Sequence, residues 1–97
     1  MIVIGSIVIR EDCLPQALAL SLAHVARART EFGCISHGVH QDSENPMRLV
    51  FVEEWSDRAA LEQHFKVPAS RAFVKQMTGL AIESPKLVIY DAAPIAP

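Results

Sequence analysis

Three short segments of the chain are hydrophobic at most positions and a fourth alternates in polarity, while two longer segments carry hydrophobic residues at helical spacing. Residues 2–10 are rich in β-branched side chains, residues 34–41 alternate in polarity, and residues 47–55 and 86–91 are further apolar runs. These patterns are typical of β-strands. The polar stretch 42–46 predicts a turn between the second and third strands.

A first helix is predicted from Asp12 to about Glu31, because Pro15 is tolerated only in the first turn of a helix. One apolar stripe runs along this helix. Gly33 follows it and favours a left-handed helix end, since glycine has no Cβ. The stripe consists of Leu14, Leu18, Leu22 and Val25.

Two more helical segments are predicted in the second half of the chain. Asp57 is a suitable N-cap for a helix through Lys66, and Pro68 begins a second segment that reaches residues 78–79. The order of elements is therefore β-α-β-β-α-β. This order predicts an α+β fold around an antiparallel sheet.

Both faces of this sheet are predicted to be apolar, because side chains of successive strand residues point to opposite faces. In the first strand Val3, Ile7 and Ile9 face away from Ile2, Ile4 and Val8. In the third strand Leu49 and Phe51 face away from Val50 and Val52, and in the last strand Leu87 and Ile89 face away from Val88 and Tyr90. Helices cover only one face, and a bare apolar sheet exceeds what monomers usually expose. We expect a two-fold dimer that packs sheet against sheet. The alternative is a more twisted sheet with its extra apolar residues at the edges.

The composition narrows the class of protein. Of the 97 residues 51% are hydrophobic and 21% are charged, and the net charge is −2. These values argue against a disordered chain and against nucleic-acid binding. No apolar run approaches the roughly 20 residues of a membrane helix, and we expect no export signal. Residues 1–91 are expected to form a single domain, followed by a flexible tail at 92–97.

Two cysteines, Cys13 and Cys34, are separated by a whole predicted helix and form no CxxC motif. A disulfide scaffold is therefore not expected, and the predicted compartment is a reducing cytoplasm. The chain also has no P-loop, GxGxxG, HExxH or clustered Cys/His motif. We accordingly predict no nucleotide, metal or other cofactor.

His64 is the first candidate for catalysis. It follows Leu61 by three residues and precedes Phe65, which places it on the apolar side of its helix. An imidazole at an apolar boundary can act as a base or as a hydrogen-bond donor near neutral pH. The alternative is a structural histidine that caps a neighbouring carbonyl group.

The other histidines are separated by the periodicity of their elements. His37 and His40 point to opposite faces of a strand, so they cannot share a metal ion. His37 follows the apolar phase of Ile35 and Val39 and is the better candidate for a pocket, although it can equally fill a core position. His24 lies outside the leucine stripe and is predicted to be exposed to solvent.

Several large apolar residues occupy core positions and are also candidates for a pocket wall. They are Phe51, Trp55, Phe73 and Met77. Glu53 and Glu54 are adjacent in a strand and face apart, so they do not form an acid–base pair of the glycosidase kind.

The segments 31–37, 41–42, 53–55 and 57–64 together resemble the antibiotic biosynthesis monooxygenase family. The similarity extends from Met1 to about residue 90, and its most specific part is Glu-Glu-Trp at 53–55 followed by His64. It implies a ferredoxin-like domain that dimerises through its sheet into an α+β barrel. Members of the family include cofactor-independent monooxygenases of phenols and quinols, haem-degrading enzymes and an isomerase of a phosphorylated sugar.

The chain departs from the family pattern in three places. Phe32 stands where the family usually has the proline of Glu-Pro-Gly, and Val67-Pro68-Ala69 replaces a Ser-Pro-His motif, so a second family histidine is absent. The positions that match the haem-degrading residues hold Gly5 or Ser6, His64 and Val74. These residues exclude the haem-degrading branch.

We therefore hypothesise a cofactor-independent monooxygenase that oxidises a phenol or quinol with O₂ in a pocket between sheet and helices. His64 takes the proton and His37 assists, while Trp55, Phe73, Met77 and Phe51 bind the ring. Two alternatives remain at this stage. One is a non-catalytic binding or stress-associated dimer without a ligand-sized cavity, and the other is a cofactor-free isomerase of a sugar-like substrate, which requires more charged groups in the pocket.

Overall fold

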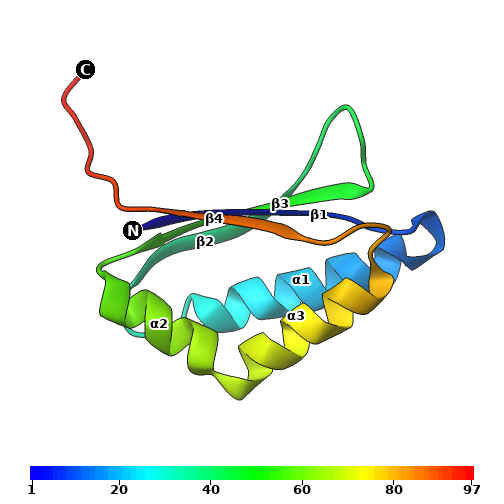
Figure 1. The fold of residues 1–97 in the computed structure, drawn as a ribbon, viewed down its shortest axis with the longest axis horizontal. Coiled ribbons are helices and arrows are strands. Elements are labelled where there is room, and N and C mark those ends of the chain that lie inside the picture. Colours follow the sequence, from blue (N-terminus) through cyan, green and yellow to red (C-terminus); the bar gives the residue numbers. More distant parts are fainter.

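A computed structural model describes residues 1–97, which form a four-stranded sheet with three α-helices on one of its faces (Figure 1). A 3₁₀ turn, Glu11–Cys13, precedes the first helix. The elements are β1 (Ile2–Val8), α1 (Leu14–Ala28), β2 (Cys34–Gln41), β3 (Arg48–Trp55), α2 (Arg58–Lys66), α3 (Pro68–Leu80) and β4 (Lys86–Tyr90).

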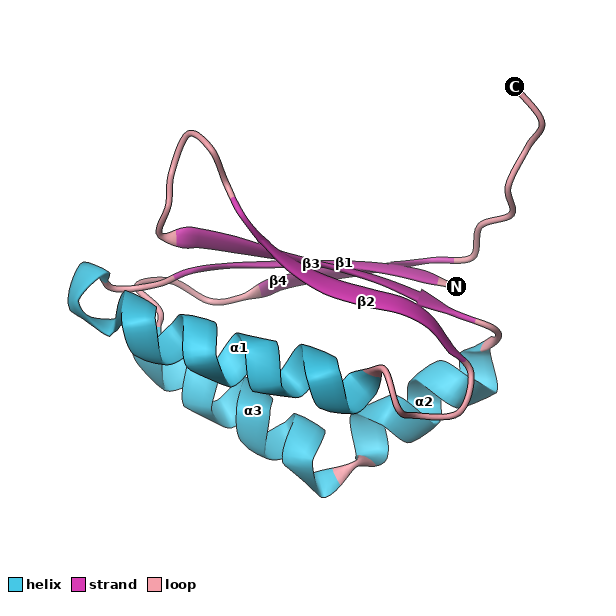
Figure 2. Ribbon diagram, turned by 180° about the vertical axis from the view of Figure 1, so that it is seen from behind, coloured by secondary structure: helices cyan, strands magenta, loops and turns pink.

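The sheet has the strand order β2-β3-β1-β4, and every pair of neighbouring strands is antiparallel. Figure 2 shows all three helices on the same side of the sheet. This arrangement confirms the predicted α+β, ferredoxin-like fold. Residues 91–97 have no regular secondary structure and extend from β4 on the side of the sheet away from the helices.

Local signals in the sequence fix the helix boundaries. The side chain of Asp57 accepts a hydrogen bond of 2.8 Å from the backbone N–H of Ala60, which caps α2 as predicted. Pro68 is the first residue of α3. Gly33 has φ = +83°, and a Cβ there would collide with the Cβ of Ala60. The turn from α1 into β2 therefore requires glycine.

Helix α1 packs differently from the prediction. Leu22, a member of the predicted stripe, is 61% exposed, whereas His24 is only 7% exposed. The buried face consists of Ala17, Ser21, His24, Val25 and Ala28. Small side chains on this face allow α1 to lie close to its neighbours, so the leucines flank the contact instead of forming its centre. The predicted exposure of His24 is therefore wrong.

On the sheet face beneath the helices, the strand side chains point as predicted, except near Ile35 in β2. Val3, Ile7, Leu49 and Phe51 are buried beneath the helices. In β2 the register shifts between Cys34 and Ser36, and Ile35 between them is 65% exposed. His37 therefore does not share the phase of Ile35, but it is 3% exposed and lies on the helix side opposite Glu53.

The opposite face of the sheet carries a patch of exposed apolar side chains, which we call the open face. Its exposed members are Ile4, Val52, Val88 and Tyr90, with 38–48% of each side chain accessible. Ile4 pairs in register with both Val52 and Val88, so the patch is continuous across three strands. None of the helices has the length and hydrophobicity that crossing a membrane requires.

Candidate functional site

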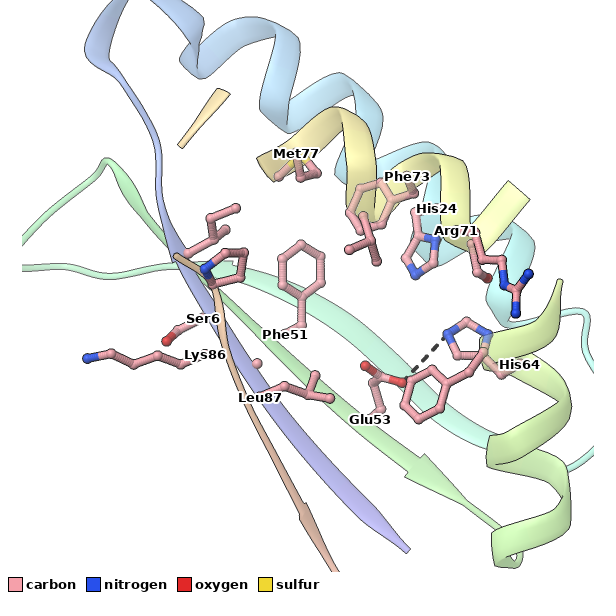
Figure 3. A pocket seen from close by; sticks show the side chains of 16 residues that line it. Ser6, His24, Phe51, Glu53, His64, Arg71, Phe73, Met77, Lys86 and Leu87 are labelled. Atoms are coloured by element: carbon pink, nitrogen blue, oxygen red, sulfur yellow. Dashed lines mark ion pairs between the residues drawn. The ribbon is translucent and has the colours of Figure 1, made fainter. Parts of the chain in front are cut away.

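A cavity of about 480 Å³ lies between the sheet and the helices (Figure 3). Strands β1, β3 and β4 contribute one wall, and helices α1, α2 and α3 contribute the other. The lining residues are Gly5, Ser6, Ile7, His24, Phe51, Glu53, His64, Phe65, Ser70, Arg71, Phe73, Val74, Met77, Pro85, Lys86 and Leu87.

Four of the six residues predicted for the site line this cavity: His64, Phe51, Phe73 and Met77. The other two, His37 and Trp55, are not lining residues. They are 3% and 1% exposed and lie behind Glu53 and His64. The structure thus brings all six side chains into one region but places two of them in a second layer.

The apolar part of the cavity is built from aromatic rings. Phe51 and Phe73 meet edge to face with their ring centroids 5.8 Å apart. Phe73 also stacks on His24, with a centroid distance of 4.0 Å and an interplanar angle of 6°. Met77, which is 3% exposed, lines the cavity beside them. A flat aromatic ligand finds complementary surfaces here.

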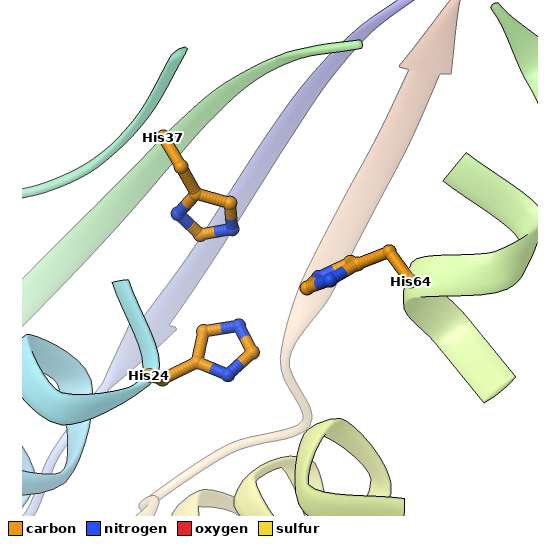
Figure 4. Close-up of side chains that lie close together, drawn as sticks. All are labelled: His24, His37 and His64. Atoms are coloured by element: carbon orange, nitrogen blue, oxygen red, sulfur yellow. The ribbon is translucent and has the colours of Figure 1, made fainter. Parts of the chain in front are cut away.

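Three histidines from three different elements converge at the polar end of the cavity (Figure 4). His24 comes from α1, His37 from β2 and His64 from α2, and one ring nitrogen of each lies within 4.8 Å of one nitrogen of each of the others. The sequence places His64 and His37 in one site but gives no signal that His24 joins them. The three side chains are brought together only by the tertiary fold.

Glu53 lies beside two of these histidines. Its Oε1 is 3.3 Å from Nε2 of His37 and 3.8 Å from Nε2 of His64. The indole Nε1–H of Trp55 donates a hydrogen bond of 3.0 Å to the same oxygen. Burial opposes ionisation of Glu53, but the nearby His37, Trp55 and His64 outweigh it and hold the pKa of Glu53 below its ordinary value. Glu53 is therefore an anion inside the site.

A second carboxylate, Glu31, holds His64 from the other side. Its Oε1 lies 2.8 Å from Nδ1 of His64, and its Oε2 accepts a hydrogen bond of 3.0 Å from Arg27. A carboxylate paired with arginine only accepts hydrogen bonds, so Nδ1 of His64 carries the ring proton. Nε2 of His64 faces Glu53, 3.8 Å from its Oε1, and has no hydrogen-bond partner within the chain.

Arg27 connects this pair to the third histidine. Its Nη2 lies 2.8 Å from Nδ1 of His24 and 3.1 Å from the hydroxyl oxygen of Ser70. Because a guanidinium only donates, Nδ1 of His24 is an acceptor. Burial is the main cause that lowers the pKa of His24 to about 3, and the nearby Arg27 guanidinium acts in the same direction. His24 is thus a neutral side chain at physiological pH.

Two cationic side chains, Arg71 and Lys86, also line the cavity, and neither forms an ion pair within the chain. Figure 3 shows them at opposite ends, with Arg71 near His64 and Lys86 near Ser6. Together with Glu53 they give the lining a formal charge of +1 when the histidines are neutral. The cavity is therefore apolar in its middle and favours a ligand with negative charge at its ends.

Comparisons with known proteins agree with this architecture. Residues 1–76 match the family model described as antibiotic biosynthesis monooxygenase. An uncharacterized protein of Synechocystis sp. is 32% identical over 93 residues, and the match covers 96% of this chain and 63% of that protein. The chain thus spans less than two thirds of the length of this curated relative.

Solved structures show the same fold. A crystal structure of an antibiotic biosynthesis monooxygenase superposes with a TM-score of 0.89 at 29% identity, over 97% of this chain and 100% of that chain. A protein from Shewanella oneidensis superposes with a TM-score of 0.85 at 27% identity, over 92% and 86% of the two chains. These similarities cover the sheet, the helices and the cavity between them.

Proposed function

Because the chain belongs to the antibiotic biosynthesis monooxygenase family, we propose that it is a cofactor-independent monooxygenase that oxidises a small phenol or quinol with O₂ in the cavity. One observation carries the proposal. The apolar cavity is lined by an imidazole, His64, whose Nδ1–H is fixed by Glu31 and whose Nε2 is free. This is the arrangement of an oriented general base.

The reaction begins with removal of the phenolic proton by Nε2 of His64. The imidazolium that forms lies between Glu31 and Glu53, at 2.8 and 3.8 Å, and both carboxylates stabilise its charge. The phenolate is electron-rich enough to pass electrons to O₂ directly. One oxygen atom enters the ring to give a quinone, and the other leaves as water with the ring hydrogen and the hydroxyl hydrogen. The substrate supplies all the electrons.

The remaining residues bind and position the groups that react. Phe51, Phe73 and Met77 pack on the ring of the substrate, and Arg71 attracts the negative charge that develops near His64. Trp55, behind the cavity wall, fixes the carboxylate of Glu53 by a hydrogen bond, and His37 lies beside the same oxygen at 3.3 Å. They are positioning residues in this proposal.

A second copy of the chain is proposed to cover the open face. Ile4, Val52, Val88 and Tyr90 form a continuous exposed patch, and Val88 and Tyr90 belong to the edge strand β4. An edge strand with such apolar surface favours association. Two-fold packing of sheet on sheet buries the patch of both copies at once.

We also propose a reducing cytoplasm as the compartment, and the free thiols Cys13 and Cys34 are compatible with it.

An isomerase of a polar, sugar-like substrate is a second candidate, because Glu53, Arg71 and Lys86 supply the charged lining that such a substrate requires. The apolar stack of Phe51 and Phe73 favours the oxygenase. A non-catalytic binding protein was expected to lack a ligand-sized cavity, and the cavity of about 480 Å³ counts against that alternative.

Oxygen uptake tests the proposal. The wild-type protein is treated with a metal chelator and given a panel of phenols and quinols, with ¹⁸O₂ to follow incorporation into the product. We expect uptake that His64→Ala reduces by at least 100-fold, while His40→Ala, on an exposed strand position, leaves it unchanged. Absence of uptake with every substrate, or an undiminished rate in His64→Ala, would overturn the proposal.

A further inference from the structure

The cluster of His24, His37 and His64 has a feature that the proposed reaction does not explain. Both ring nitrogens of His37 are buried without a hydrogen-bond partner, and the contact of Nε2 with Glu53 at 3.3 Å lacks hydrogen-bond geometry. A buried polar atom without a partner costs about 1–3 kcal/mol. A buried polar group of this kind requires an explanation, and a bound ion supplies one.

We propose that His24, His37 and His64, with the carboxylate of Glu53, form a binding site for a divalent transition-metal ion such as Zn²⁺ or Co²⁺. The proposal goes beyond the proposed oxygenase function and does not depend on it. Imidazole nitrogens with one carboxylate favour Zn²⁺ and its neighbours in the first transition row over Mg²⁺ and Ca²⁺, which prefer oxygen ligands.

The distances suit such an ion after a small movement. Metal–nitrogen bonds of about 2.1 Å in a tetrahedral site place the ligand nitrogens about 3.4 Å apart. The three nitrogens here lie within 4.8 Å of one another, and Oε1 of Glu53 is 3.3 and 3.8 Å from two of the rings. The nitrogens that are farthest apart must approach each other by up to about 1.4 Å to reach this geometry.

The surroundings of the ligands are those of a metal centre. Glu31 accepts the Nδ1 proton of His64, which leaves Nε2 free for an ion, and metal-binding histidines are usually held in this way. Trp55 holds the carboxylate of Glu53 through its indole N–H.

Ligation by His24 requires one rearrangement. Its Nδ1 accepts from Arg27, so the ring proton is on Nε2. For Nε2 to bind an ion, this proton must move to Nδ1 and Arg27 must turn away. The side chain of Arg27 is 30% exposed and keeps a second partner in Glu31, which makes this movement possible.

Metal binding and the proposed reaction exclude each other, because both use the Nε2 lone pair of His64. A bound ion therefore converts the proposed base into a ligand. The metal-loaded protein is expected to be inactive as an oxygenase, and removal of the ion by a chelator is expected to restore activity.

Titration of the chelator-treated protein with Co²⁺ tests the site without reference to any activity. We expect visible absorption bands of nitrogen-coordinated Co²⁺ that saturate at one equivalent per chain and disappear when Zn²⁺ is added. His37→Ala and His64→Ala are expected to weaken binding at least 100-fold, and His40→Ala to leave it unchanged. Circular dichroism establishes that each variant is folded.

The melting temperature of the wild-type protein provides a second test that does not depend on whether the variants fold. One equivalent of Zn²⁺ is expected to raise the melting temperature of the wild type, because the ion binds only the folded state. Absence of saturable Co²⁺ bands in the wild type, or equal affinity in folded His37→Ala, would overturn the proposal. Loss of binding in His40→Ala would do the same, since it would place the ion at another site.

Discussion

Nδ1 of His64 lies 2.8 Å from Oε1 of Glu31, although 33 residues separate them in the chain. The contact joins the turn after α1 to the last turn of α2 and places a proton on Nδ1 of His64. It does so at the edge of the cavity, where the other nitrogen is free. The relationship thus makes a histidine on an apolar helix face into an oriented base.

Replacing Glu31 with glutamine tests this relationship. The amide oxygen of Glu31→Gln still accepts the Nδ1 proton, but the negative charge that stabilises the imidazolium is lost. Hydrogen bonds to charged groups are worth about 1.5–3 kcal/mol, so we expect kcat to fall about 10–100-fold. Steady-state kinetics across pH also report the base, and the acid limb of the profile should move to lower pH. Glu62→Gln, on the exposed side of α2, is the matched control, and equal kinetics in the two variants would contradict the role of Glu31.

Trp55 is predicted to stabilise the fold through its indole N–H. Trp55→Phe keeps most of the apolar ring but removes the 3.0 Å hydrogen bond to the buried carboxylate of Glu53. We expect the free energy of unfolding to fall by about 1.5–3 kcal/mol, measured by urea denaturation. Phe32→Ala, at a position that is 94% exposed, should change it by less than about 0.5 kcal/mol. A stable Trp55→Phe protein would mean that Glu53 has found another donor.

Replacement by alanine should change the free energy of unfolding in opposite directions at two glycines. Gly33→Ala forces a side chain into a position with φ = +83° and into contact with Ala60, so we expect strong destabilisation of at least about 2 kcal/mol. Gly79 lies near the end of α3, and a methyl group added there would meet no other atom within 4 Å. Gly79→Ala should raise the free energy of unfolding by about 0.5–1 kcal/mol. Thermal denaturation of the two variants checks the difference in sign.

The proposed dimer depends on the open face. Val52→Lys places a charge in the exposed apolar patch beside Ile4, and burying that charge in a sheet-to-sheet interface is costly. We expect the wild type to sediment as a dimer and Val52→Lys as a folded monomer. Leu22→Lys, at a position that is 61% exposed on α1, should remain dimeric. A wild type that is monomeric at micromolar concentration would contradict the interface.

Most of the fold follows from local signals in the sequence. Pro15, Asp57 and Pro68 mark the helix starts, and glycine at position 33 marks the turn into β2, so the predicted boundaries of most elements lie within about two residues of those observed. The predicted last strand and the β-α-β-β-α-β order are also present. These features depend on short-range geometry, which periodicity and capping patterns report directly.

The polar half of the site could not be predicted in the same way. The leucine stripe of α1 predicts that Leu22 is buried. The face that packs is instead the one with the small residues Ala17 and Ser21, and His24 lies on this same buried face. Glu31 and Arg27 act through contacts with residues far along the chain. The only signal for Glu31 in the sequence was its place in the family-like Glu31-Phe32-Gly33 segment.

The ionisation of a bound phenol tests the central claim most directly. A chromogenic phenol, whose phenolate absorbs visible light, is titrated with the chelator-treated protein under argon, at a pH about one unit below the pKa of the free phenol. We predict that the wild type binds it as the phenolate, and that His64→Gln binds it as the neutral phenol. A bound phenol that stays neutral in the wild type, or ionises equally in His64→Gln, would contradict the assignment of His64 as the base.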